Sequence, residues 1–318
     1  MTHVVRPAPR GPTLPAMGSG VEPSHLRRFV AHTEQKVEPR EVAKLYPRAE
    51  MLGKLPLSVQ RWIVAHAGGD PYMGFVVEPY CLFLAYEIVD LAAARLQLPA
   101  DYELAPTTMF AGGDPRHCAI LGAFNVHTSV FWGGRVEMYL IAENTRTGML
   151  TWVICDYESN TINYDPGQGF SGSTTKQSVI TTTHAGDVIV DVQSRERPNH
   201  LGVTAALPGA PMRALDQRLW IDGNLSVDYG GRLMDADSVP FGLIFDPGEM
   251  EQALDIPLDA VIVEHNSFGA GILAPQPFEV AVFPYAQHFL TTSYPQPSQI
   301  HDHAGLEEAV RAFAVAAD

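Results

Sequence analysis

The feature that most constrains this chain is the stretch from Val126 to Ala185, in which apolar segments alternate with compact turn signals. Three of its segments are rich in β-branched and aromatic residues and have the length of strands, namely 136–142, 150–154 and 178–183. Between the first two, Asn144-Thr-Arg-Thr-Gly148 supplies Asn and Gly, which tolerate the positive φ of a tight turn. The stretch therefore predicts a β-hairpin followed by a third strand.

The connection between the second and third segments is longer and has a different composition. Residues 164–175 combine Gly167, Gly169 and Gly172 with several Ser and Thr residues. Connections of this length between strands are uncommon, and glycine-rich ones often carry function. We expect a functional loop here.

Strand-like segments continue on both sides of this stretch, about ten residues apart and separated by Gly and Pro. This rhythm is typical of a sandwich or a closed β structure, so we expect an α+β fold that is mainly β. The expected strands include 219–227, 232–234, 243–245 and 271–273, and the expected helices include 25–33, 40–46, 59–66, 91–98 and 306–317. We divide the chain into a flexible arm (1–20), a helical N-terminal extension (21–70), a β domain (71–290) and a C-terminal linker with a helix (291–318).

Bulk composition excludes several classes of partner. No apolar run approaches the roughly 20 residues of a membrane-spanning helix, and residues 1–20 do not resemble a signal peptide, so we expect a cytoplasmic protein. The formal net charge of −15 argues against nucleic acid and anionic membranes, because both require basic patches. A small molecule is the partner that this charge allows.

Cysteine and histidine spacing predicts neither a disulfide framework nor a cofactor. Cys81, Cys118 and Cys155 are odd in number, widely spaced and set in apolar segments, which favours buried free thiols. His301-Asp302-His303 alternates as metal ligands on a strand can, but the same residues also suit the entry to the last helix. We expect no metal and no cofactor.

Three stretches, taken in order, resemble one known family. They are Phe83–Asp90 with the helix that follows and Leu98-Pro99, the region 142–176, and Phe241–Asp246 with the segments up to Val280. In order and spacing they are similar to the acetoacetate decarboxylase family over roughly residues 79–285. The resemblance implies a β-cone or barrel with an internal active site, and it implies homo-oligomers.

The departure from this family falls on its chemistry. The family's motif lysine forms a Schiff base with a β-keto acid, and a neighbouring lysine lowers its pKa. Ser171, Gly172 and Ser173 occupy those places in this chain. Lys176 follows shortly after and is a candidate for the Schiff base; the alternative is a surface lysine that protects a strand edge.

Acid/base chemistry offers a second set of candidates. Arg135 and Glu137 alternate on one expected strand and so share a face, where they could orient a carboxylate and move a proton, or form a salt bridge at a barrel rim. Asp156 and Glu158 alternate on the next strand. A carboxylate from each strand could meet across the hairpin as an acid/base pair, or all could be solvated.

We therefore expect an enzyme of the lyase, hydratase or isomerase type that acts on a small carbonyl or carboxylate metabolite by acid/base catalysis, without a Schiff base. The alternatives are a non-catalytic small-molecule-binding barrel and a barrel filled by its own side chains. The candidate catalytic residues are Glu137, Arg135, Asp156 and Lys176, and the candidate substrate-binding residues are Phe170, Ser171, Ser173, Glu264 and His265.

Overall fold

Two long neighbouring strands, β5 (Arg116–Thr128) and β6 (Trp132–Asn144), form the centre of the fold. The structure is a computed structural model that describes residues 23–40, 42, 51–66, 72–129, 131–235, 239–292 and 299–315. β5 and β6 pair antiparallel from Ala119↔Leu140 to His127↔Trp132. Most of their side chains are buried whichever way they point, so each face of this pair is covered by another layer.

The predicted hairpin follows β6 and is confirmed. β6 turns into β7 (Leu150–Ser159), and the N–H of Gly148 donates to the carbonyl of Asn144 at 2.7 Å. Gly148 has a φ of +72°, which a residue with a side chain rarely adopts. The register shifts once, between Met138 and Tyr139, where a bulge interrupts the ladder.

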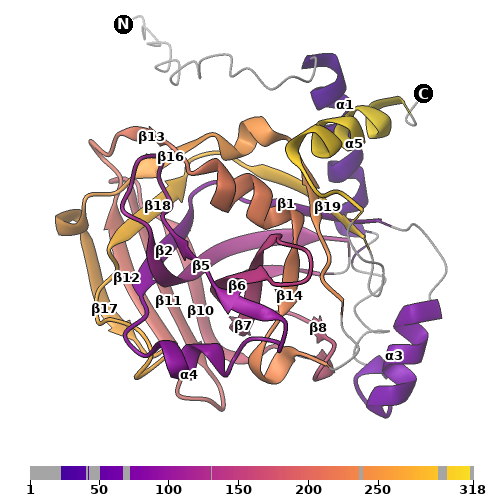
Figure 1. Ribbon diagram of the computed structural model, residues 1–318, viewed down its shortest axis with the longest axis horizontal. Helices are drawn as coiled ribbons and strands as arrows, with labels where there is room; N and C mark the ends of the chain where they lie inside the picture. The colour runs from indigo at the N-terminus through magenta and orange to yellow at the C-terminus, as the bar shows by residue number, and fades with distance from the viewer. Residues whose placement is uncertain are drawn as a thin grey trace, which may run out of the picture.

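These strands belong to a sheet of thirteen strands (Figure 1). β2 and β1 share one edge of β5, while β6, β7 and β14 follow on its other edge. The other strands of this sheet are β1 (Tyr72–Val77), β2 (Cys81–Glu87), β3 (Tyr102–Leu104), β4 (Pro106–Thr107), β13 (Met212–Ala214), β14 (Val227–Tyr229), β15 (Leu243–Phe245), β16 (Gln252–Asp255), β18 (Glu279–Phe283) and β19 (Gln287–Thr292).

The sheet curls but is not a closed barrel of paired strands in the described part of the chain. Its two ends approach each other through one isolated bridge, in which Val227 and Phe241 exchange backbone hydrogen bonds of 2.6 and 2.8 Å. The expectation of a cone or barrel is therefore confirmed only in its coarser form, a mainly β fold with helices at its periphery.

A second sheet of four strands covers one face of the central strands. Its members are β10 (Thr175–Thr182), β11 (Asp187–Ser194), β12 (His200–Ala206) and β17 (Val261–Asn266). β11 alternates strictly between buried and half-buried residues, as expected for a strand with one face against a core. Val188, Val190 and Val192 of β11 share a hydrophobic core with Leu121 and Val136 of the large sheet.

The opposite face of the central strands lies on a second hydrophobic core that is rich in aromatic residues. The Trp220 ring lies 5.0 Å from that of Phe83 and 5.3 Å from that of Trp152, measured between centroids. Trp220 belongs to a short helical segment, residues 218–225, that covers this core. The expectation of a strand over 219–227 is therefore wrong except at Val227.

Helices lie at the periphery (Figure 1). They are α1 (Pro23–Lys36), α3 (Leu57–His66), α4 (Leu91–Arg95) and α5 (His303–Val315). α1 and α5 pack together on β1, where Phe313 meets Phe29 and Tyr72 at centroid distances of 6.4 and 4.8 Å. None of the helices within the described ranges has the length and apolar character needed to cross a membrane.

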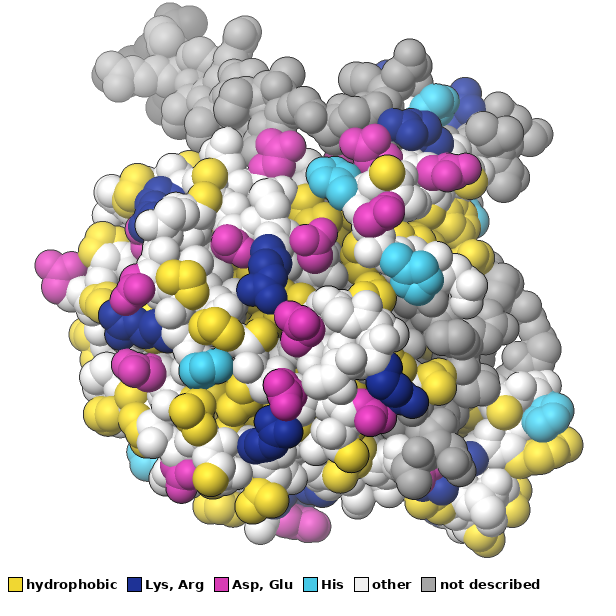
Figure 2. All heavy atoms as spheres, in the orientation of Figure 1, with side chains coloured by type: hydrophobic (Ala, Val, Ile, Leu, Met, Phe, Trp, Pro, Cys, Tyr) yellow, Lys and Arg dark blue, Asp and Glu magenta, His cyan; other side chains and the backbone are white. Residues whose placement is uncertain are grey.

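Charged side chains of both signs are mixed on the surface. Figure 2 shows one face, on which Lys and Arg side chains lie interspersed with Asp and Glu side chains. Ion pairs between exposed partners include Arg95 with Glu103, at 3.4 Å, and Arg218 with Glu143, also at 3.4 Å. The described side chains on the face in Figure 2 therefore form no block of positive charge of the kind that binds nucleic acid.

Four further expectations differ from the structure or lie outside the described residues. Residues 231–233 form a helical turn instead of the expected strand, and residues 271–273 contribute a single bridge, Ile88↔Leu273, instead of a strand. The expected arm over 1–20 and most of the expected helix over 40–46 lie outside the described residues. The proposed domain boundaries stay predictions.

Candidate functional site

Arg135, Glu137 and Tyr139 alternate along β6 and point to the same side of the large sheet, away from the four-stranded sheet. Opposite them on β7, Tyr157 pairs with Glu137 in the ladder. β14 runs parallel to β7 and adds Tyr229 to the same side. Three strands therefore place one arginine, one glutamate and three tyrosines in a single cluster, which we call the Arg135 cluster.

Glu137 is the centre of this cluster. The side chain is 9% exposed, and its two carboxylate oxygens accept hydrogen bonds from Arg135 Nε and from the Tyr139 hydroxyl. A buried carboxylate needs such donors because removing it from water is costly. The arrangement holds an ionisable carboxyl group in a fixed orientation inside the protein.

Arg135 is held from two further sides. Its Nη1 donates to Asn163 Oδ1 at 2.6 Å, and its guanidinium carbon lies 4.3 Å from the centroid of the Tyr157 ring. Stacking on an aromatic face stabilises a guanidinium group that has left bulk water. Nη2 donates no hydrogen bond to the described residues.

The glycine-rich connection supplies the next layer of contacts. It folds into a small two-stranded sheet, β8 (Asn163–Asp165) and β9 (Gly169–Ser171). Asp165 of β8 accepts a hydrogen bond from the Tyr157 hydroxyl at 3.0 Å and another from the backbone N–H of Gln168 at 2.7 Å. Ser171 of β9 lies near Tyr157 and acts to lower the pKa of that phenol. The predicted functional loop therefore touches the cluster directly.

Helix α3 fixes this small sheet from outside. The Gln60 side chain, which is 4% exposed, accepts a hydrogen bond from the Phe170 N–H at 2.8 Å. Arg61 donates to the carbonyl of Pro166 at 2.7 Å. Gly169, with a φ of +76°, lets the chain pass Gln60, because a Cβ atom there would lie 2.5 Å from Gln60 Oε1.

Burial sets the protonation of the cluster. Burial first, and Glu137 second, raise the pKa of Tyr139 well above its usual value, while burial and Asp165 raise the pKa of Tyr157 to about 12. Burial likewise raises the pKa of Tyr229 and that of Asp165. For Arg135, burial acts to lower the pKa, but Glu137 and the tyrosines raise it overall. At neutral pH the three phenols are proton donors beside a charged guanidinium.

Two donors of the cluster are not used by the protein itself. They are Nη2 of Arg135 and the hydroxyl of Tyr229, neither of which has a hydrogen-bond acceptor in the described ranges. A cation and a neutral hydroxyl donor together can stabilise a carboxylate or a developing oxyanion. Glu137 beside them can accept a proton.

Asp156 was expected beside these groups, and this expectation is wrong. Successive residues of β7 point to opposite faces, so Asp156, which pairs with Met138, faces away from Glu137. Its carboxylate is ion-paired with Arg197, accepts from Asn199 at 2.8 Å and lies 3.2 Å from Arg232. Of the two alternatives that the sequence left open, the meeting of Asp156 with Glu137 across the hairpin does not occur.

Three other candidates also lie away from the cluster. Lys176 is exposed at the start of β10, which is an edge strand, beside a break in register. Glu264 and His265 are exposed on β17, the other edge of the same sheet, where the His265 ring lies 4.3 Å from that of His200. Lys176 follows the motif positions 171–173 by a few residues, and this places it on β10 of the four-stranded sheet.

The candidates in the glycine-rich connection lie closer. Phe170 is half-buried and packs on Tyr164 at a centroid distance of 4.8 Å, and Ser171 contacts Tyr157. The Ser173 hydroxyl lies 3.3 Å from both oxygens of Thr175, on the path back to β10. Of the predicted site residues, Arg135, Glu137 and Ser171 are therefore the ones that the fold brings together.

The tyrosines, Asn163 and Asp165 were not among the predicted residues. Tyr139 could have been found, because it continues the alternation of Arg135 and Glu137. Tyr229 has no local signal, since it reaches the cluster through parallel pairing with a strand from a distant part of the chain. As for metals, the described residues contain no group of three or more His, Cys, Asp or Glu arranged to hold one.

Comparisons with known proteins give a distant similarity to a solved structure. No family model matches the sequence, and no curated protein matches it. Among solved structures, the chain is similar to an acetoacetate decarboxylase from Legionella pneumophila subsp. pneumophila strain Philadelphia 1, with a TM-score of 0.46 and 12% sequence identity. The alignment covers 72% of this chain and 87% of that chain.

Proposed function

We propose that this chain is an acid/base enzyme of the lyase, hydratase or isomerase type, acting on a small metabolite that carries a carbonyl or a carboxylate. The observation that carries the proposal is the burial of Glu137 between Arg135 and Tyr139, with Nη2 of Arg135 and the Tyr229 hydroxyl left as donors in the described ranges. Buried ionisable groups with perturbed pKa values gather at functional sites more often than elsewhere.

The chemistry follows from the charges of these groups. Nη2 of Arg135 would bind a carboxylate or carbonyl oxygen of the substrate, and the Tyr229 hydroxyl would donate to the same oxygen or its neighbour. Glu137 would take a proton from the carbon next to the carbonyl, leaving an enolate whose negative charge lies on the oxygen that Arg135 and Tyr229 hold. Return of the proton to the opposite face of that carbon would give an isomerase outcome, and loss of a leaving group from the neighbouring carbon would give a lyase outcome.

The absence of motif lysines from the sequence separates this proposal from Schiff-base chemistry. Ser171 stands at one motif position and contacts Tyr157, while Lys176 is exposed on the outer sheet. A mechanism that uses Arg135, Glu137 and Tyr229 requires no amine. The resemblance in segment order to the acetoacetate decarboxylase family suggests small oxo acids as the first substrates to test.

The experiment follows proton exchange at carbon. The purified chain is incubated in D₂O with a panel of small 2-oxo and 3-oxo acids, and exchange of their α-protons is followed by proton NMR. We expect catalysed exchange that Glu137→Gln lowers by at least about 100-fold, the lower range of a general acid/base contribution. Glu264→Gln, which alters an exposed carboxylate on β17, is the matched control and should exchange at the wild-type rate.

A non-catalytic binding protein is the second candidate, favoured by one observation. Both oxygens of Glu137 already accept hydrogen bonds from the protein, as they would in a structural ion pair. In that case an oxo acid of the panel would raise the melting temperature without any exchange, and Glu137→Gln would change binding alone. Exchange that survives in Glu137→Gln would contradict the catalytic proposal.

A further inference from the structure

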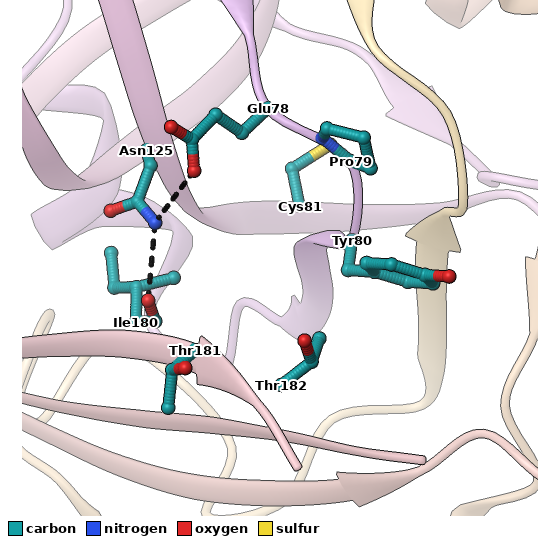
Figure 3. A pocket seen from close by; sticks show the side chains of 8 residues that line it. All are labelled: Glu78, Pro79, Tyr80, Cys81, Asn125, Ile180, Thr181 and Thr182. Atoms are coloured by element: carbon teal, nitrogen blue, oxygen red, sulfur yellow. Dashed lines mark hydrogen bonds between the residues drawn. The ribbon is translucent and has the colours of Figure 1, made fainter. Parts of the chain in front are cut away.

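A second candidate site lies on the opposite side of β5 from the Arg135 cluster. It is a pocket of about 120 Å³ between the turn that follows β1 and the outer strand β10 (Figure 3). Asn125 of β5 lines it and pairs with Gly134, whereas the neighbouring Phe124 pairs with Arg135 and faces the cluster. Because successive residues of a strand point to opposite faces, the pocket and the cluster are separate sites.

The polar groups of the pocket include a single charge, and it is negative. Figure 3 shows Glu78 and Asn125 on one side and the Tyr80 ring on the other, with Thr181 and Thr182 of β10 along the base. Among the described residues, none that lines the pocket is Lys or Arg. Glu78 is 43% exposed, so its carboxylate can reach a molecule in the pocket.

Hydrogen bonds within the wall use the donors of Asn125 and leave the Glu78 carboxylate and the threonine hydroxyls as acceptors. Asn125 Nδ2 donates to Glu78 Oε2 at 3.2 Å and to the carbonyl of Ile180 at 3.1 Å, which uses both of its N–H groups. Asn125 Oδ1 points toward Gly134 of β6, away from the pocket (Figure 3). His127 Nε2 lies 2.5 Å from Glu78 Oε1 and fixes the carboxylate from behind. Such a wall suits a ligand that donates hydrogen bonds.

The aromatic side of the pocket is held in an unusual backbone conformation. Tyr80 has a φ of +69°, the left-handed region that turns normally fill with glycine, and its N–H donates to the carbonyl of Phe283 at 2.6 Å. No other non-glycine residue in the described part of the chain has a positive φ. A tyrosine kept where glycine fits better is a reason to look for a role of its ring.

We propose that this pocket binds a small organic ammonium ion. The carboxylate of Glu78 would neutralise the ammonium group, the hydroxyls of Thr181 and Thr182 would accept its N–H bonds, and the Tyr80 ring would line the other side of the pocket. The volume of about 120 Å³ suits a ligand of a few heavy atoms. The net charge of −15 favours the approach of cations to the whole molecule.

The test measures binding of defined probes to the full chain. Methylammonium and tetramethylammonium chloride are titrated by calorimetry and by NMR line broadening of the probe, with potassium chloride and sodium acetate as comparison salts. We expect saturable binding of an organic ammonium probe, weakened at least about tenfold in Glu78→Gln because the charge partner is lost. Glu264→Gln should bind as wild type does, because that carboxylate is exposed elsewhere, on β17.

Tyr80→Gly separates a role in binding from a role in folding. Glycine relieves the positive φ, so this variant should fold and melt at a temperature no lower than that of the wild type, yet bind the probe several-fold more weakly. Unaltered binding by Tyr80→Gly or Glu78→Gln would overturn the proposal, as would absence of saturable binding, or binding of potassium or acetate in place of the ammonium probes.

Glu137→Gln keeps the two sites distinguishable. Glu137 and the pocket lie on opposite faces of the central strands, so this variant should bind the ammonium probe at wild-type strength whatever its effect on proton exchange. A coupled loss of both would contradict the assignment of two separate sites.

Discussion

Arg135 and Glu137 lie two residues apart on β6, and the Nε of Arg135 donates to the carboxylate of Glu137 in an interior where both side chains are about one-tenth exposed, at 11% and 9%. Two opposite charges placed on one face of a strand by simple alternation thus become a buried ion pair. The pair contributes more as an orienting device than as a source of stability, because desolvation offsets most of the attraction between its members.

Removing one member of this pair should destabilise the fold more than removing both. Arg135→Met leaves Glu137 buried without its charge partner and should lower the free energy of unfolding by about 3–5 kcal/mol. The double variant Arg135→Met/Glu137→Met removes both charges and should be markedly more stable than Arg135→Met alone. Urea unfolding followed by tryptophan fluorescence measures both. A double variant as unstable as the sum of its single variants would show that the two side chains act independently.

A different buried pair should make stability depend on pH. His288 of β19 lies with its Nδ1 2.7 Å from Glu249 Oε1, and its Nε2 lies 3.8 Å from Glu34 of α1. Burial acts to lower the pKa of His288, but Glu249, with Glu34 and Asp246, raises it overall; burial in turn raises the pKa of Glu249. Both shifts mean that the folded protein holds its protons more tightly than the unfolded chain does.

These shifts give the pH dependence a definite sign. The stability that His288 contributes is complete below the unfolded value of 6.5 and is lost as pH rises through the higher folded value. The urea midpoint of the wild type should therefore fall as pH rises above 6.5. His288→Gln should show a smaller fall over the same range. An equal slope in both proteins would mean that other groups control this pH dependence.

Any side chain at Gly169, where β9 passes α3, should destabilise the fold. Gly169→Ala meets both a φ of +76° and a Cβ position 2.5 Å from Gln60 Oε1, and should cost about 1–3 kcal/mol of stability. Gly172→Ala is the matched control, because its Cβ would have no heavy atom within 4 Å, and it should change stability by less than about 0.5 kcal/mol. Chemical denaturation of the two variants in parallel gives the comparison.

Two different causes could destabilise Gly169→Ala, and a further variant separates them. Gly148→Ala has the same kind of positive φ, +72°, with no atom within 4 Å of the added Cβ. It should therefore report the effect of the backbone conformation alone. If Gly148→Ala costs as much stability as Gly169→Ala, the close approach of Gln60 contributes nothing.

The sequence pattern correctly predicted those parts of the fold that depend on neighbouring residues, namely a turn and the alternation of side chains along a strand. The hairpin over Asn144 to Gly148 follows from a turn with positive φ between two apolar runs, and Arg135 and Glu137 share a face because a strand alternates. Apolar composition alone misassigned residues 218–225, since a buried helical segment and a buried strand can have the same hydrophobic content. Trp220 is buried by a helical segment that the pattern cannot distinguish from a strand.

The rest of the site depends on pairing between distant segments. The register of the hairpin aligns Glu137 with Tyr157, so Asp156 and Glu137 face opposite sides of the sheet. A shift of one residue in this register would move every side chain of the strand to the other face. Tyr229 joins the cluster through a parallel strand from a later part of the chain, and Gln60 reaches the small sheet beside it from a helix near the N-terminus. Neither contact can be predicted from the residues around Tyr229 or Gln60, because each depends on a distant segment of the chain.

Lys176, the one lysine that follows the glycine-rich connection, should be dispensable. Because it is exposed on the edge strand β10, Lys176→Met should change the free energy of unfolding by less than about 0.5 kcal/mol and leave α-proton exchange at the wild-type rate. Borohydride reduction in the presence of a small ketone, followed by peptide mass spectrometry, should find no adduct on the peptide that contains Lys176. An adduct there, together with loss of exchange in Lys176→Met, would mean that this lysine reaches the substrate and that an amine takes the role proposed for Glu137 and Arg135.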